Sequence, residues 1–257
     1  MVKILSIAVL VGAIVSCSNQ PNTEKTSAQT DSLSYETIMM MQSYNGCDKD
    51  SNGCTYIEFS YPQFSNANGA LADSLNTIVH HAFGDAEKNI TSPDSVQQDF
   101  LSAYSIFKKK QKNCTIPWFV EKSLTVLNQN PKWITLAYDE STFTGGAHPN
   151  SYLQYSIIEK ISGRKMMLTD FFDSTAIYKL MALGDTEFRS LKGINPNQTL
   201  EDAGFWFDDN RFTLNTNFYL HEGGITFFYN NYEIGPYVMG STEITIPANK
   251  LVKLMKK

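Results

Sequence analysis

The hydrophobic period of this chain changes in blocks, with groups of strand-like segments separated by groups of helix-like ones. Apolar residues recur at the strand period of two at 55–64, 118–128, 132–143, 151–159, 217–230 and 241–247. Helices are predicted at 71–84, after Ser92, at about 174–192, and as a short closing element at 248–257. Because strict strand–helix alternation is absent, antiparallel pairing is favoured over a parallel sheet. We therefore predict an α+β fold, mainly an antiparallel sheet with packed helices, in two closely associated α+β subdomains.

Capping residues predict where two of these helices begin. Ser92 can accept a hydrogen bond from the first turn of the second helix, where Pro93 is tolerated because a missing N–H costs nothing there. Asp173 is the expected cap of the helix at 174–192, and Gly84 suits the end of the first helix.

The first residues of the chain predict export and anchoring. Lys3 precedes an apolar run at 4–15, which is shorter than the ~20 residues that a membrane-spanning helix needs. This pattern predicts a signal peptide at 1–16. With Cys17 directly after a small residue, it resembles the lipobox of bacterial lipoproteins, in which the cysteine is acylated. The alternative is an ordinary signal peptide with a structural cysteine near its cleavage site.

Behind this leader we expect three parts. Residues 17–34 are polar without apolar periodicity and should form a lipidated flexible tether. An N-terminal α+β region at 35–138 and a C-terminal domain at 139–257 follow. The net charge of −5 argues against nucleic acid as a partner.

Three cysteines remain once Cys17 is set aside. An exported chain reaches an oxidising compartment, where disulfides form. Cys47 and Cys54 lie seven residues apart around a turn-rich stretch and are the expected disulfide, with Cys114 left free. Pairing of Cys114 with either of them is also compatible with the sequence, because spacing alone does not determine connectivity.

The stretch DKDSNG between these cysteines copies the start of a calcium loop. Asp48, Asp50 and Asn52 stand at positions 1, 3 and 5, with a glycine at position 6. Position 12 should carry a carboxylate, but it is Phe59, and a strand follows where a helix is needed. We expect a disulfide-closed acidic turn without a metal, and calcium is the alternative.

The stretch TGGAHPN at 144–150 has two interpretations. As a catalytic residue, His148 would act as a general base or metal ligand, but no acidic residue stands at a diagnostic spacing from it. As a structural turn, the stretch uses Gly145 and Gly146 for positive φ angles and Pro149 to end strand pairing. We expect the turn, and keep a catalytic His148 as the alternative. The sequence contains no known nucleophile, zinc-ligand or phosphate-loop motif.

Aromatic residues are abundant, and most are expected in the core. Tyr232, Glu233 and Tyr237, however, lie beside glycine and proline, in a pattern typical of a loop that presents aromatic faces and a carboxylate. Such a surface could stack on sugar rings or anchor a protein partner, with His148 as a further candidate binding residue.

Two longer stretches resemble a known family. One is TFTGGAHPNSYLQYSIIEKISGRKMMLTDFF at 142–172, and the other is the segment at 218–255 with its YEIGPYVMG and ITIP elements. They are similar to the extracytoplasmic domain of RsiV-type anti-sigma factors, which is also found on some peptidoglycan deacetylases and in stand-alone bacterial lipoproteins. The resemblance covers about 140–256, with a weaker family-like segment at 54–138.

The resemblance implies a binding module. In the anti-sigma members this domain binds a host-type lysozyme, and in the deacetylases it accompanies a separate catalytic domain. We expect a non-enzymatic, lipid-anchored envelope protein that binds a lysozyme-like muramidase or peptidoglycan and uses no cofactor. It should face the periplasm from the outer membrane, with surface exposure as an alternative. The functional alternative is a hydrolase or deacetylase of envelope polysaccharide with His148 in its site.

Overall fold

The computed structural model describes residues 33–65, 69–113 and 115–256. The predicted signal peptide, the lipidation site at Cys17, most of the tether and Cys114 lie outside these ranges. Within them, no helix has the length and apolar character needed to cross a membrane.

The first half of the chain forms a five-stranded sheet in the order β1-β2-β3-β4-β5. Its strands are β1 (Ser34–Ser43), β2 (Tyr56–Ser65), β3 (Phe119–Gln129), β4 (Trp133–Phe143) and β5 (Asn150–Glu159). Neighbours pair antiparallel except for β2 and β3, which run parallel. The parallel pair requires a crossover, and the two helices between these strands provide it.

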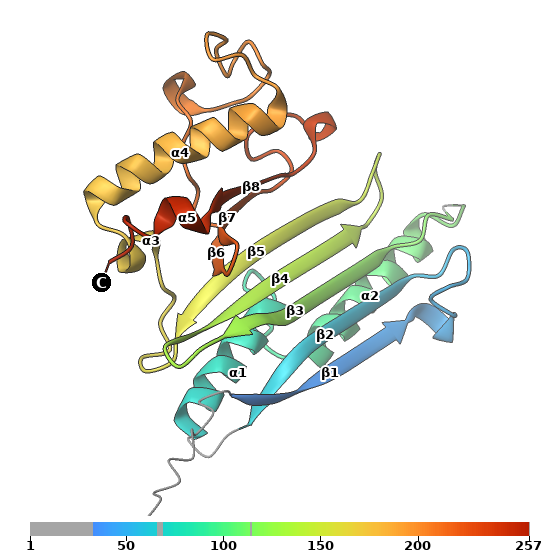
Figure 1. Ribbon diagram of the computed structural model, residues 1–257. Coiled ribbons are helices and arrows are strands. Elements are labelled where there is room, and N and C mark those ends of the chain that lie inside the picture. Colours follow the sequence, from blue (N-terminus) through green and yellow to red (C-terminus); the bar gives the residue numbers. More distant parts are fainter. Residues whose placement is uncertain (1–32, 66–68, 114, 257) are drawn as a thin grey trace, which may run out of the picture. The chain divides into compact units, whose positions relative to one another are not determined.

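These two helices cover one face of the sheet (Figure 1). They are α1 (Gly69–Phe83) and α2 (Pro93–Lys110). Their apolar stripes and the inward side chains of β2 to β5 share a buried core that includes Phe59, Leu75 and Leu136. Ser92 caps α2 by accepting a hydrogen bond from the Ser95 N–H, and Pro93 is in the first turn, as predicted.

The second half of the chain builds a three-stranded antiparallel sheet with a long helix beside it. The elements are α3 (Leu168–Phe171), α4 (Ser174–Lys192), β6 (Phe218–His221), β7 (Gly224–Tyr229), β8 (Thr242–Pro247) and α5 (Ala248–Leu251). Single 3₁₀ turns occur at Tyr44–Gly46, Asp208–Asn210 and Tyr237–Met239. Asp173 caps α4 through the Ala176 N–H, as predicted. A phenylalanine-rich core centred on Phe188 and Phe227 joins α4 to this sheet.

The α+β class and the mostly antiparallel pairing are confirmed, and two strand predictions differ in detail. Strand β1 was not predicted because Ile38–Met41 is continuously apolar, which hides the alternation of an edge strand. The segment at 217–230, predicted as one strand, is the β6–β7 hairpin. The change from the five-stranded sheet to the three-stranded sheet comes after β5.

Side-chain amides, rather than another strand, cover the outer edge of β5. The Leu153 N–H donates to Asn230 Oδ1 and the Tyr155 N–H donates to Asn217 Oδ1, each at 2.7 Å. The Leu153 carbonyl accepts from Asn217 Nδ2 at 2.7 Å and from Asn230 Nδ2 at 3.0 Å. The two asparagines flank β6 and β7, so their amides connect the second sheet to the edge of the first.

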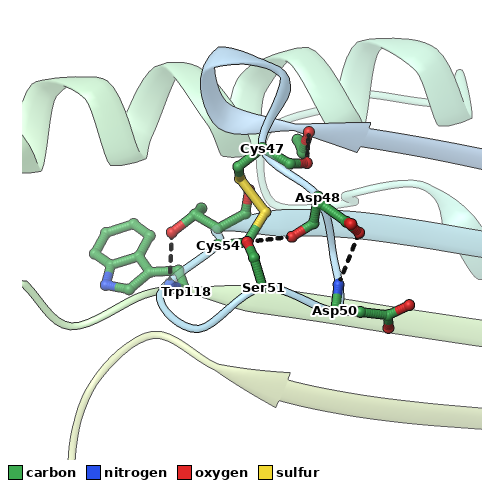
Figure 2. Close-up of a disulfide and its surroundings, with 8 residues drawn as sticks. Cys47, Asp48, Asp50, Ser51, Cys54 and Trp118 are labelled. Carbon is green, nitrogen blue, oxygen red and sulfur yellow. Dashed lines mark hydrogen bonds between the residues drawn. A yellow bond between two sulfur atoms is a disulfide. The ribbon is translucent and has the colours of Figure 1, made fainter.

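The predicted disulfide between Cys47 and Cys54 is present and closes the loop between β1 and β2 (Figure 2). Inside the loop, Asp48 accepts hydrogen bonds from the Asp50 N–H and from the Ser51 hydroxyl. Just after the loop, the hydroxyl of Thr55 accepts from the backbone N–H of Trp118 at 2.8 Å, at the start of the β2–β3 pairing. The disulfide joins the two ends of the loop, and the Thr55 hydrogen bond connects its C-terminal end to the start of β3.

We predict that Asn217→Ala destabilises the protein by ~1–3 kcal/mol, because it leaves the buried Tyr155 N–H without its acceptor. Urea denaturation followed by circular dichroism would measure this loss. Asn197→Ala, at an exposed asparagine, is the matched control. Equal midpoints for the two variants would show that the amide contacts at β5 contribute nothing to stability.

We also predict that the double variant Cys47→Ser/Cys54→Ser lowers the free energy of unfolding by ~2–3 kcal/mol, because the unfolded chain regains the entropy of an open loop. The comparison is again made by urea denaturation. Wild-type protein in a reducing agent should show the same loss. An unchanged midpoint in both samples would contradict the prediction.

Candidate functional site

Three residues expected at a binding surface meet in space although they come from distant parts of the chain. The imidazole of His148 stacks on the ring of Tyr237, with ring centroids 3.6 Å apart and planes 12° apart. The ring of Tyr232 lies 5.6 Å from that of Tyr237 and 6.5 Å from that of His148. We call His148, Tyr232 and Tyr237 the aromatic cluster.

The turn between β4 and β5 positions His148. Gly145 and Gly146 have φ angles of 107° and 115°, a region that residues with a side chain rarely adopt. The predicted backbone role of these glycines is confirmed, and it is this turn that carries the imidazole out to an exposed position. Tyr237 Oη donates to the Pro149 carbonyl at 3.4 Å. This hydrogen bond connects the β4–β5 turn to the loop between β7 and β8.

The loop between β7 and β8 supplies the two tyrosines. Tyr232 has a φ angle of 66°, which is unusual for a bulky residue and costs on the order of 1 kcal/mol or more. Its side chain is nevertheless on the surface, with 52% of the residue exposed. A strained backbone that holds an exposed ring in place is typical of a functional position.

Glu233 stabilises this loop. Its carboxylate accepts from the Asn230 N–H at 2.8 Å and from Asn215 Nδ2 at 2.7 Å. Both oxygens of Glu233 thus hold the loop that carries Tyr232. The side chain is also exposed, so its predicted role in ligand binding stays a prediction.

An open cleft of about 390 Å³ lies next to the aromatic cluster, with Tyr232 among its walls. Its remaining lining is mostly amide and hydroxyl groups: Tyr152, Gln154, Asn215, Thr216, Asn217, Asn230, Asn231 and Glu233. Amides offer both donors and acceptors, so the cleft suits a neutral ligand rich in hydroxyl or amide groups. Apart from Glu233, sequence reasoning missed these residues, and the asparagines among them are ordinary turn formers in loops.

The contacts of His148 do not form a catalytic arrangement. Its Nδ1 lies 2.9 Å from the Pro149 carbonyl oxygen, which can only accept, so Nδ1 carries the proton there. Nε2 is then the acceptor for Tyr232 Oη at 3.4 Å. The lone pair that a general base would use is therefore directed at a phenol hydroxyl.

Besides Glu233, two carboxylates on β4, Asp139 and Glu140, pair in register with Leu153 and Tyr152 of β5, and Tyr152 lines the cleft. Burial, together with the charges of Glu121 and Glu140, raises the pKa of Asp139 above its ordinary value. Burial also raises the pKa of Tyr152, with Glu233 and Glu140 contributing. In the described part of the chain, no three His, Cys, Asp or Glu side chains come together as a metal site would require.

The calcium alternative at Asp48, Asp50 and Asn52 has little geometric support. Asp48 Oδ1 accepts the Asp50 N–H at 3.1 Å, which makes it part of a local turn. Asp50 and Asn52 are exposed, and the neighbouring Lys49 forms an ion pair with Glu58.

Comparisons with known proteins agree with this architecture. The family model described as "Deacetylase PdaC" matches residues 48–151, and the one described as "Protein of unknown function (DUF3298)" matches residues 169–249. A comparison with curated proteins gives no match.

Two solved structures are similar to this chain. A DUF3298 family member from Bacteroides fragilis NCTC 9343 has 22% identity and a TM-score of 0.69, and the match covers 89% of this chain and 95% of that one. A DUF3298 family protein from Pseudomonas aeruginosa PAO1 has 17% identity and a TM-score of 0.65, covering 88% and 96%. Identities this low establish the fold alone. The RsiV-type subgroup remains a prediction. Residues 48–151 match the PdaC model, residues 169–249 match the DUF3298 model, and the chain has the fold of solved DUF3298 family structures.

Proposed function

We propose that this protein is a non-catalytic envelope module that binds a cell-wall glycan through the aromatic cluster and the neighbouring amide cleft. The observation that carries the proposal is the exposed stack of His148 on Tyr237, beside the strained and half-exposed Tyr232. In the proposed arrangement, the chain is anchored through Cys17 and the module faces the periplasm at the end of its tether.

The aromatic cluster and the cleft together match the chemistry of a sugar ring. The faces of sugar rings are lined by C–H groups, which pack on aromatic faces, while their hydroxyl and acetamide groups need hydrogen-bond partners at the edges. The cluster supplies the faces and the cleft supplies the amides. This combination of apolar surface with a few polar groups is what a small-ligand site requires.

The cluster is also pre-organised. Gly145, Gly146 and Glu233 hold the two turns that carry the rings, and the rings contact one another before any ligand arrives. Binding then requires little ordering of the site, which reduces its entropic cost.

Two other functions have specific support. The PdaC match favours chemistry on envelope polysaccharide, which would make His148 a catalytic residue. The acidic net charge and the carboxylates of Asp139 and Glu140 beside the cleft favour a basic protein such as a lysozyme-like muramidase. Attraction of that kind weakens as salt screens the charges.

We predict that Tyr237→Ala weakens binding to purified peptidoglycan sacculi at least tenfold, equivalent to ~1.4 kcal/mol, because the stack with His148 is lost. The unlipidated Cys17→Ser chain is used as the background, and co-sedimentation at increasing protein concentration gives the affinity. Tyr178→Ala is the matched control, since Tyr178 is an exposed tyrosine on α4. Equal retention of both variants would contradict the proposal.

We predict that Tyr232→Gly separates binding from stability. Glycine adopts a φ angle of 66° without strain, so the free energy of unfolding should stay within ~1 kcal/mol of wild type while sacculus binding falls.

The rival functions give different results in the same samples. Glycan stacking should change little between low and moderate salt, whereas retention of a basic lysozyme, lost at moderate salt, would favour the protein partner. Acetate release from sacculi that disappears in a folded His148→Ala variant would favour the enzyme.

A further inference from the structure

A second cavity, of about 500 Å³, lies between the five-stranded sheet, α2 and the loop that joins α1 to α2. Its lining is partly apolar and includes Ile57 of β2, Val120 of β3 and Phe100 of α2. Trp118, which lies beside the disulfide loop (Figure 2), also lines it. We call this cavity the Trp118 pocket. All of its lining residues belong to the segment that matches the PdaC model.

The indole of Trp118 packs against aromatic rings of α2. Its ring centroid is 4.9 Å from that of Phe107 and 5.3 Å from that of Tyr104. Its Nε1 is buried and has no hydrogen-bond partner among the residues that the structure describes. Because nearly all buried donors in native proteins are satisfied, an unpaired one needs an explanation. An oxygen atom of a ligand in the pocket would provide the missing acceptor.

Lys122 brings a largely buried positive charge to the Trp118 pocket. Only 14% of its side chain is exposed. Its Nζ is 3.8 Å from Glu140 Oε2, which is longer than a hydrogen bond, and that carboxylate already accepts from Tyr138 Oη. The ammonium also lies 6.0 Å from the ring centroid of Phe59. Since an ammonium has three donors, Lys122 can still bind a carboxylate of a ligand.

Negative charge is in excess around the Trp118 pocket, because its lining contains four carboxylates and two lysines. The second lysine, Lys88, lies 2.6 Å from Asp99 Oδ2 and 3.6 Å from Asp85 Oδ2, so one ammonium serves two carboxylates. Glu87, in the same loop, is exposed. An amino group of a ligand is the complement of these carboxylates.

The Trp118 pocket is next to the cleft of the candidate site. Glu140 lines the pocket and pairs in register with Tyr152, which lines the cleft. The Cα atoms of residues paired in this way are about 5 Å apart. Thr144, which also lines the pocket, is in the β4–β5 turn that carries His148. A single branched ligand can therefore reach the pocket and the aromatic cluster together.

We propose that the Trp118 pocket binds the short peptide branch of the wall polymer whose sugars bind at the aromatic cluster. This inference rests on the proposed function, because it takes that polymer to be peptidoglycan. The peptide branches of peptidoglycan carry free carboxylate and amino groups. The carboxylate would pair with Lys122, and the amino group with Asp85 and Glu87.

The rest of the peptide matches the remaining lining of the Trp118 pocket. Backbone carbonyl oxygens are acceptors for the indole N–H of Trp118, and small apolar side chains can pack on Val120. A volume of about 500 Å³ is within the range of ~300–1,000 Å³ that is normal for small-ligand sites.

The test titrates two probes separately into the unlipidated Cys17→Ser chain by isothermal titration calorimetry. One probe is the free peptide that an amidase releases from purified peptidoglycan, and the other is the disaccharide of N-acetylglucosamine and N-acetylmuramic acid. We expect Lys122→Met to weaken binding of the free peptide at least tenfold and to leave binding of the disaccharide unchanged. Ala103→Trp, which fills the pocket from α2 without changing the charge, should do the same.

Lys179→Met and Ala182→Trp, at exposed positions of α4, are the matched controls and should bind both probes like the parent. A free peptide that does not bind the parent would overturn the inference, and so would equal peptide affinity in the pocket variants and the controls. Weaker binding in Lys122→Met alone would also overturn it, because charge attraction without occupation of the pocket would then explain the result.

A second measurement does not depend on the folding of the pocket variants. In a Trp133→Phe/Trp206→Phe chain, Trp118 is the remaining tryptophan, and its fluorescence should change when the free peptide binds. Peptide binding without such a change would place the peptide elsewhere and overturn the inference. The disaccharide titration tests the proposed function separately, since a chain that binds the peptide but not the disaccharide would contradict the glycan site alone.

Discussion

The hydrogen bonds from Asn217 and Asn230 to the edge of β5 are the interaction on which the arrangement of the described chain depends. A sheet edge with free N–H and C=O groups invites pairing with another chain, and side-chain amides satisfy those groups without adding a strand. Because an asparagine side chain is short, the loops that carry these residues must lie directly on β5. Asn230 comes two residues before Tyr232, so the contact that covers the edge also brings the tyrosine loop to the turn of His148.

The aromatic cluster then depends on two backbone conformations that most residues avoid. Gly145 and Gly146 adopt their positive φ angles freely, whereas Tyr232 adopts its own at a cost. The hydrogen bonds of Glu233 within its loop can offset that cost. The strain at Tyr232 is informative because glycine would adopt this φ angle without cost, whereas tyrosine keeps an aromatic ring on the surface there.

Local features were predictable from the sequence, and distant contacts were not. The caps Ser92 and Asp173, the Cys47–Cys54 disulfide and the turn at Gly145 depend on neighbouring residues, and each has a chemical signature. The sequence also pointed to His148 and Tyr237 separately. Their stacking joins positions 89 residues apart (237 − 148), and no spacing rule connects them. The hydrogen bonds of Glu233 to Asn215 and Asn230 likewise leave no pattern in the sequence.

A site made of three rings and a polar cleft has modest intrinsic affinity, because so small a contact area barely exceeds the entropic cost of association. Tethering changes this balance. A module confined near a wall polymer meets repeating sites at high effective concentration, so weak single contacts add up to stable retention without new interactions. In the proposed arrangement, easy release from each site is useful, since the module can move along the polymer while its proposed anchor stays in the membrane. On this argument the cluster at Tyr237 needs no deep pocket, and the openness of its cleft is consistent with a polymeric ligand.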